Sequence, residues 1–151
     1  MEEQFIPYEL ALELKELGFD KRCFTTYTPK HLGNELSNPF NIDLDEFNEL
    51  KSSFTLINLP NKAFVKNSEC VNCVSAPLWQ QAFDWFRDTL LFDSWVTPYW
   101  FIDGEFKQKR YTFSIEPSNN FDEYFDCKAE DYDTYEEARL ECLKKLIEIV
   151  K

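Results

Sequence analysis

Two cysteines, Cys70 and Cys73, stand two residues apart in the stretch CVNC, a spacing that can hold a metal or support redox chemistry. A tetrahedral zinc site needs two further cysteine or histidine ligands. The other cysteines are single and scattered, and the one histidine is His31. A redox pair places its second cysteine in the first turn of a helix, whereas Cys73 precedes Pro77, where the next helix is predicted to begin. Structural or incidental cysteines are therefore favoured, and Cys70 and Cys73 stay incomplete metal candidates.

The second candidate is the acidic and aromatic stretch 116–137, which holds nine carboxylates and one basic residue, Lys128. Carboxylates mixed with aromatic rings can imitate phosphates and bases, which predicts a site for a protein partner with a basic surface. The alternative is a solvated loop whose aromatic side chains turn inward. The stretch has no glycine, which excludes a calcium loop of the EF-hand type. The predicted partner-binding residues are Asp122, Glu123, Tyr124, Asp126, Glu130 and Asp131.

The third candidate lies between residues 95 and 110, where cations and aromatic side chains are close in sequence. An aromatic wall beside cations could bind a nucleotide-like anion by stacking and charge. The alternative is a solvent-facing strand whose lysines shield a sheet edge. The predicted ligand-binding residues are Tyr99, Trp100, Lys107, Lys109 and Arg110.

Composition excludes several classes of function. The three glycines, Gly18, Gly33 and Gly104, cannot form a glycine-rich phosphate loop or a nucleophile elbow. The formal net charge of −12 disfavours direct binding to nucleic acid. It is compatible with a basic partner, although a charge that only keeps the chain in solution is the favoured interpretation of net charge alone. No catalytic residue and no cofactor is predicted, and a hydrolase that uses the acidic stretch is the least favoured alternative.

The N-terminus is acidic and amphipathic and lacks the apolar core of a signal peptide. No apolar run approaches the roughly 20 residues that a membrane helix needs. Together with the odd number of cysteines, five, these features predict a reduced, soluble, cytoplasmic protein.

The elements that must position these groups are three main helices and several strands. Apolar residues at helical spacing, with proline or a capping box at the start, predict helices over 7–17, 77–90 and 135–150. In the second helix, Trp85 is expected to flank a buried stripe made of Trp79, Ala82, Phe83, Phe86 and Leu90. Aromatic and β-branched runs predict strands over 23–28, 53–59 and 121–127, with 63–66 returning against 53–59, and a short helix over 43–50.

The stretch WVTPYWFIDGEFKQKRYTFSI predicts a hairpin, with Asp103 and Gly104 as a two-residue type I′ turn. Pro98 must then lie at an open edge or a bulge, because it donates no ladder hydrogen bond. The turn predicts four facing pairs, which are Ile102 with Glu105, Phe101 with Phe106, Trp100 with Lys107, and Val96 with Tyr111.

Hairpins joined by short connections predict an α+β fold, an antiparallel sheet of hairpins with about three helices packed mainly on one face. The length of 151 residues predicts a single domain, 1–151, in which the Asn-rich range 29–69 is a candidate insertion.

Three predicted helical segments, FIPYELALELKELGF, APLWQQAFDWFR and TYEEARLECLKKLIEIV, resemble segments of small uncharacterised proteins from Bacteroidetes genomes and their phages. That group has no established activity and no assigned catalytic residues, so the resemblance implies a setting only. A phage-borne chain would act in the host cytoplasm as an accessory protein that modulates a host protein or blocks a defence system.

Taken together, these patterns predict a non-catalytic acidic binding or inhibitor protein. The alternative is a small-ligand binder that sequesters a nucleotide-like anion, ahead of a zinc-binding protein or a hydrolase.

Overall fold

The computed structural model describes residues 4–23, 25–29, 54–58, 64–69, 73–118, 125–126 and 131–151. The chain divides into two compact units, Met1–Ala82 (unit 1) and Phe83–Lys151 (unit 2). The described residues form helices and two antiparallel three-stranded sheets, which confirms the predicted α+β class. Each unit is described by itself, and the single domain over 1–151 stays a prediction.

Unit 1 begins with the helix α1, Tyr8–Glu16, which confirms the predicted helix over 7–17 to within one residue at each end. Pro7 lies just before the helix, where its fixed φ and missing N–H cost nothing. Gly18 has a φ of +91°, a left-handed conformation that glycine adopts without strain and that ends the helix. The side chains that α1 buries are Tyr8, Leu10, Ala11 and Leu14.

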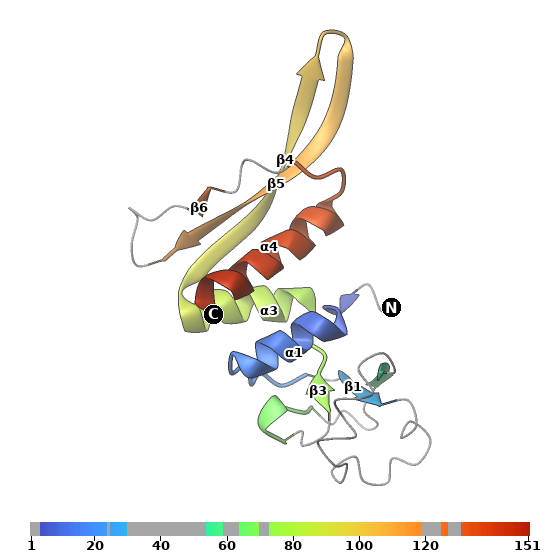
Figure 1. Ribbon diagram of the computed structural model, residues 1–151, viewed down its shortest axis with the longest axis vertical. Helices are drawn as coiled ribbons and strands as arrows, with labels where there is room; N and C mark the ends of the chain where they lie inside the picture. Colours follow the sequence, from blue (N-terminus) through green and yellow to red (C-terminus); the bar gives the residue numbers. More distant parts are fainter. Residues whose placement is uncertain are drawn as a thin grey trace. The chain divides into compact units, whose positions relative to one another are not determined.

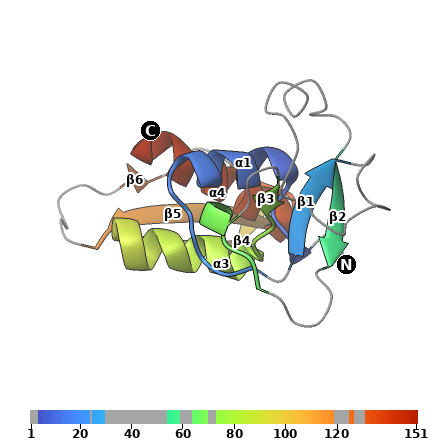
Figure 2. The same ribbon diagram turned by 90° about the horizontal axis from the view of Figure 1, so that it is seen from below.

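The unit 1 sheet has β1, Thr25–Pro29, between β2, Phe54–Asn58, and the short β3, Val74–Ser75 (Figure 2). The strands predicted over 23–28 and 53–59 are therefore present in slightly shorter form. The prediction that 63–66 returns against 53–59 is wrong, because Val65 exchanges backbone hydrogen bonds of 2.8 and 2.9 Å with Cys23 instead. The predicted helix over 43–50 lies outside the described residues. The described part of 29–69 contributes to unit 1, and the insertion stays a prediction.

The predicted helix over 77–90 is two helical segments. The α-helix α3 spans Trp79–Trp85, and a π-helical turn, η5, spans Phe86–Leu90 and ends at Leu91 with a φ of 60°. The spacing of apolar residues cannot distinguish the α-helix from the π-helical turn, because the π-turn continues the same right-handed helix with one extra residue. Trp85, the last residue of α3, is 4% exposed and is a core residue rather than a flanking one.

Unit 2 is built on a long hairpin, β4, Phe92–Asp103, and β5, Phe106–Pro117. The turn lies one residue later than predicted, at Gly104 and Glu105, so Asp103 faces Phe106 and each of the four predicted facing partners is wrong by two residues. Gly104 has a φ of +59°, and Gly104 is the one turn residue with a positive φ. A turn with glycine first, the type II′ pattern, needs one left-handed residue, whereas the predicted type I′ turn would also force Asp103 into that conformation.

The helix α4, Tyr135–Val150, packs against β4 and β5 and matches its predicted range. Figure 1 shows α4 along the base of the hairpin, with the hairpin turn lying beyond the N-terminal end of α4. The short strand β6, Phe125–Asp126, pairs with β5 at Ser114 and Ile115, inside the predicted strand 121–127. The core of unit 2 includes Phe113, Ile115, Ala138, Cys142, Leu143, Leu146 and Ile147.

The predicted capping box at the start of α4 is present. Thr134 Oγ1 accepts a hydrogen bond from the Glu137 backbone, and Glu137 Oε2 accepts one from the Thr134 backbone.

We expect Thr134→Ala to lower the free energy of unfolding of unit 2 by about 1 kcal/mol, because one N–H at the helix start loses its acceptor. Urea denaturation monitored by circular dichroism measures this change. Thr134→Ser is the control, since it keeps the oxygen, and an equal loss in both variants would contradict the capping role.

Candidate functional site

The part of the hairpin beyond α4 carries large apolar side chains in solvent. We define the hairpin tip as residues 99–108. Within the tip, Trp100 is 65% exposed, Ile102 60%, Phe106 58% and Phe101 45%. At the base of the same hairpin, Phe113 is 3% exposed. The tip is therefore an exposed continuation of strands that are buried at their other end.

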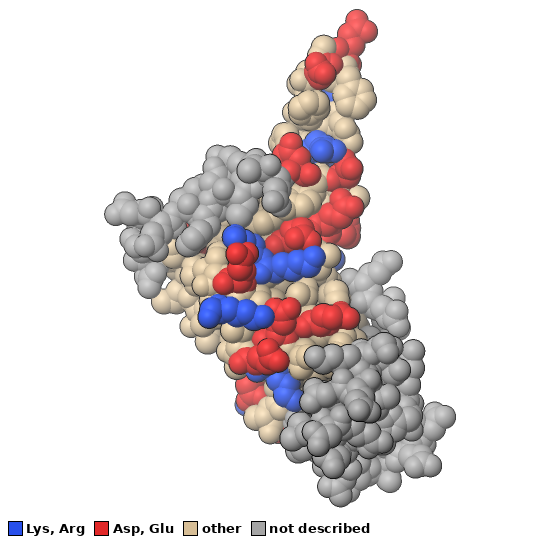
Figure 3. Space-filling view, in the orientation of Figure 1, with Lys and Arg blue, Asp and Glu red and all other residues tan. Residues whose placement is uncertain are grey.

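The apolar side chains lie on both faces of the tip. Alternation along the strands places Trp100 and Ile102 on the face that α4 covers further down, which we call the inner face. Phe101 and Phe106 lie on the opposite, outer face. Figure 3 shows acidic side chains at the end of the hairpin, with an uncharged surface directly behind them. The acidic residues of the turn region are Asp103 and Glu105, both exposed and, among the described residues, in no ion pair.

The structure divides the predicted ligand-binding residues between the two faces. Trp100 faces Lys109 rather than the predicted Lys107, and Lys107 lies beside them on the same inner face. Tyr99 faces Arg110 on the outer face. The ammonium group of Lys109 lies 5.2 Å from the centre of the Tyr111 ring, a cation–π contact. The five residues therefore do not converge on one anion site.

Part of the acidic stretch meets the outer face of the hairpin. Arg110 forms an ion pair with Asp133, and Gln108 donates a hydrogen bond of 3.1 Å to the same carboxylate. The hydrogen bond between Tyr99 and Asp131 raises the pKa of the tyrosine hydroxyl, with burial adding to the effect. These contacts neutralise Arg110, so its charge is not available to an external anion.

Asp131 is the predicted partner-binding residue whose side chain the structure describes, and it is exposed. The backbone of Asp126 lies in β6. The remaining four predicted residues, Asp122, Glu123, Tyr124 and Glu130, lie outside the described residues. The sequence prediction missed Phe101, Ile102 and Phe106, although apolar residues on both sides of the predicted turn were a visible signal.

The edge of β4 that faces away from β5, which we call the outer edge, is unpaired within the part of the chain that the structure describes. Tyr111 and Tyr132 exchange backbone hydrogen bonds of 2.9 Å, so the N–H and C=O of Tyr111 point away from β4. Pro98, which faces Tyr111, therefore turns its nitrogen and carbonyl away from β5 and toward the outer edge. No described strand pairs with this edge. This confirms the expectation that Pro98 lies at an open edge, where its missing N–H costs no bond to β5.

The thiol groups of the described residues offer no metal site. Cys73 is buried and disulfide-bonded, which differs from the expectation of a fully reduced chain. Cys23 and Cys142 are buried and form no disulfide bond, and burial raises the pKa of the Cys23 thiol to about 11. Among the described residues no three potential metal ligands lie together. Cys70 and His31 lie outside them.

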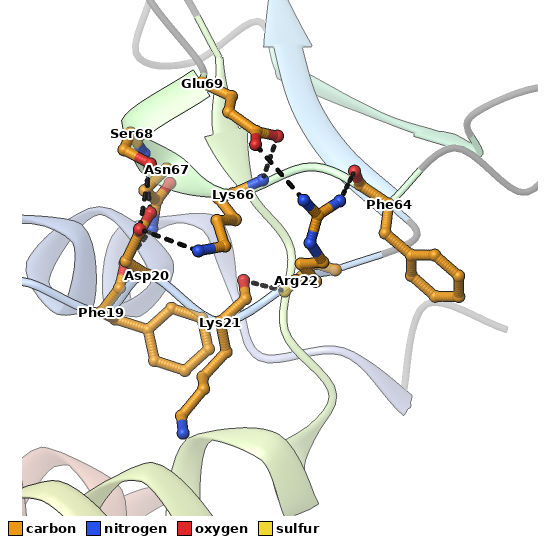
Figure 4. Close-up of polar contacts among 10 residues, drawn as sticks. Phe19, Asp20, Lys21, Arg22, Phe64, Lys66, Asn67, Ser68 and Glu69 are labelled. Atoms are coloured by element: carbon orange, nitrogen blue, oxygen red, sulfur yellow. Dashed lines mark hydrogen bonds and ion pairs between the residues drawn. The ribbon is translucent and has the colours of Figure 1, made fainter.

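A second polar cluster lies in unit 1, where the segment 19–23 meets the segment 64–69 (Figure 4). The Asp20 carboxylate accepts hydrogen bonds of 2.8 and 2.9 Å from the backbone and hydroxyl of Ser68, and the first of these is the main cause of its lowered pKa. Arg22 and Lys66 pair with Glu69 and Asp20 at 3.7 Å. Each charge in the cluster has an opposite partner, so it joins two segments and leaves no net charge for a ligand.

Comparisons of the chain with protein-family models, with curated proteins and with solved structures find no match. Within the part of the chain that the structure describes, no helix has both the length and the apolar character to span a bilayer.

Proposed function

We propose that this protein is an acidic, non-catalytic binding protein that docks onto a protein partner with a basic surface, using the hairpin tip. The observation that carries this proposal is the exposure of Trp100, Phe101, Ile102 and Phe106 on a two-stranded ribbon. Contiguous exposed apolar side chains mark interaction sites. Tryptophan is also among the residues that contribute most to binding at protein interfaces.

The position of these side chains supports docking rather than a role in folding. A two-stranded ribbon is marginally stable in water unless a further layer covers it. The base of the hairpin has that layer in α4, whereas the exposure of the tip leaves both of its faces in solvent. Contact with a partner would therefore bury apolar area and stabilise the tip at the same time.

The charge of the turn favours a basic protein as the partner. Asp103 and Glu105 would be the first groups to enter a groove, and the chain carries a net charge of −12. Opposite charge on the partner increases the rate of encounter and keeps unsuitable partners away. A lipid bilayer is disfavoured, because these carboxylates would enter its apolar core before the aromatic rings.

The small-ligand alternative has weaker support. Small-molecule sites enclose roughly 70–90% of the ligand surface. The tip exposes Trp100 on one face of a ribbon, while Tyr99 and Arg110 lie on the other, and Arg110 is already paired with Asp133. An inhibitory role toward a host protein, which the resemblance to phage proteins implies, agrees with docking into a groove.

We expect the double variant Trp100→Ser/Ile102→Ser to lose the partner. Tagged wild-type and variant proteins are expressed in cells of the native source, crosslinked, and recovered for mass spectrometry. A basic protein should be recovered with the wild type and fall about tenfold or more with the variant, because central interface residues contribute 2 kcal/mol or more each.

The control is Phe64→Ser, which removes an apolar side chain of similar exposure, 49%, in unit 1. It should leave recovery unchanged. Recovery of the same proteins with the wild type and the double variant would contradict the proposal.

A further inference from the structure

The outer edge of β4 offers hydrogen-bonding groups along the same hairpin. Because the pairing of β4 with β5 has one register from end to end, every second residue repeats the orientation of Pro98. Ser94, Val96, Trp100 and Ile102 therefore direct backbone N–H and C=O groups outward. The described residues of β4 form no hydrogen bond from this edge.

The residues of β4 themselves supply little of the usual protection against pairing with another chain. Natural edge strands are protected by lysines, bulges, short length or proline. The strand β4 has 12 residues, a regular register and no lysine or arginine, and its one protecting residue is Pro98. The edge can therefore accept a partner strand on either side of Pro98.

The charges of β4 indicate what kind of strand fits. Asp93 and Asp103 lie near the two ends of β4 on the outer face, and Trp95 and Phe101, which are 42% and 45% exposed, lie between them on the same face. A complementary strand has basic residues toward its ends and apolar residues between them on that face.

We propose that an extended segment of the partner, apolar in the middle and basic toward its ends, adds to the outer edge of β4 as a further strand. This inference rests on the proposed function and specifies how the partner binds. Backbone hydrogen bonds would supply affinity, and the aromatic and acidic residues of β4 would supply specificity.

A second copy of this chain fits the edge less well. If two β4 edges paired antiparallel about Thr97, Asp93 of one copy would face Phe101 of the other and lie diagonal to its Asp103. Like charges so placed oppose pairing, and each copy carries a net charge of −12.

The test uses two synthetic peptides of 12 residues, the length of β4. Both alternate threonine and valine, and they differ only in carrying lysine or glutamate near the two ends. We expect the lysine peptide to bind the full chain about tenfold or more tightly than the glutamate peptide, because the glutamates would face the carboxylates of Asp93 and Asp103 and be repelled. Fluorescence anisotropy of the labelled peptides measures both affinities, and equal binding would overturn the inference.

The variant Ser94→Pro tests the hydrogen-bonding edge directly. It removes an outward N–H and no hydrogen bond to β5, as Pro98 already does. We expect it to weaken binding of the lysine peptide about fivefold relative to Ser94→Ala, which loses the same side chain and keeps the N–H. Circular dichroism establishes that both variants fold, and unchanged affinity in folded Ser94→Pro would overturn the inference.

Two further outcomes separate this inference from the function on which it rests. If Ser94→Pro keeps the captured partner while Trp100→Ser/Ile102→Ser loses it, strand addition is wrong and docking at the tip stands. Sedimentation equilibrium of the wild type should show a monomer. A dimer that Ser94→Pro abolishes would assign the edge to a second copy and overturn the inference.

Discussion

Phe113→Ala is expected to lower the free energy of unfolding of unit 2 by about 3–5 kcal/mol, the usual cost of removing a buried phenylalanine ring. Phe113 is 3% exposed, and its ring stacks on Tyr132 with 5.9 Å between the ring centres. Its removal would leave a cavity on the face of the hairpin that α4 covers.

Trp100→Ala, on the same face of the same hairpin, is expected to change stability by no more than about 0.5 kcal/mol, because the side chain is already in solvent. Hydrogen exchange measured by mass spectrometry reports the stability of unit 2 for both variants. If Trp100→Ala cost as much as Phe113→Ala, the tryptophan would be part of the core, and the docking proposal would lose its main support.

The second large effect is expected at Asn67 in unit 1. Its side chain is 7% exposed and joins two segments, because Nδ2 donates to the Phe19 carbonyl at 2.8 Å and Oδ1 accepts from the Ser75 N–H at 2.9 Å. Asn67→Leu keeps a similar volume but removes both of these hydrogen bonds. Each buried backbone group that loses its hydrogen bond costs about 1–3 kcal/mol, so we expect a total loss of about 2–6 kcal/mol.

Urea denaturation, followed by hydrogen exchange within 4–23 and 64–82, measures the effect of Asn67→Leu. Lys21→Ala is the matched control, since the Lys21 side chain points away from the polar cluster in Figure 4 and is exposed. Its expected change is within about 0.5 kcal/mol. An Asn67→Leu protein as stable as this control would show that the two backbone groups find other partners.

Local sequence signals predicted the helices whose first or last residues include a recognisable start or stop signal. Pro7 and Gly18 limit α1, and the Thr134 capping box starts α4, so both helices have almost the predicted bounds. The segment after Pro77 has no comparable stop signal. Leu91 ends η5 in a left-handed conformation that leucine rarely adopts, so its residue type does not predict the end of the helix.

The candidate site was predicted in part. The predicted hairpin has Trp100, Lys107 and Lys109 on one face, and so does the observed one. The observed register shifts each facing partner by two residues, and a shift of two leaves every side chain on the same face of the sheet. Spacing along the chain could not reveal that Asp133 neutralises Arg110, since that contact joins residues far apart in sequence. Nor could the residue types show where α4 stops covering the hairpin, and this limit decides which apolar side chains are exposed.

The turn at the end of the hairpin has a consequence for how this protein can change during evolution. Gly104 takes the one positive φ that the turn requires, so the neighbouring positions, Asp103 and Glu105, carry no such backbone constraint. Substitutions there can alter the charge presented to a partner without straining the strands behind. Recognition at this end of the molecule can therefore diversify while the fold is conserved.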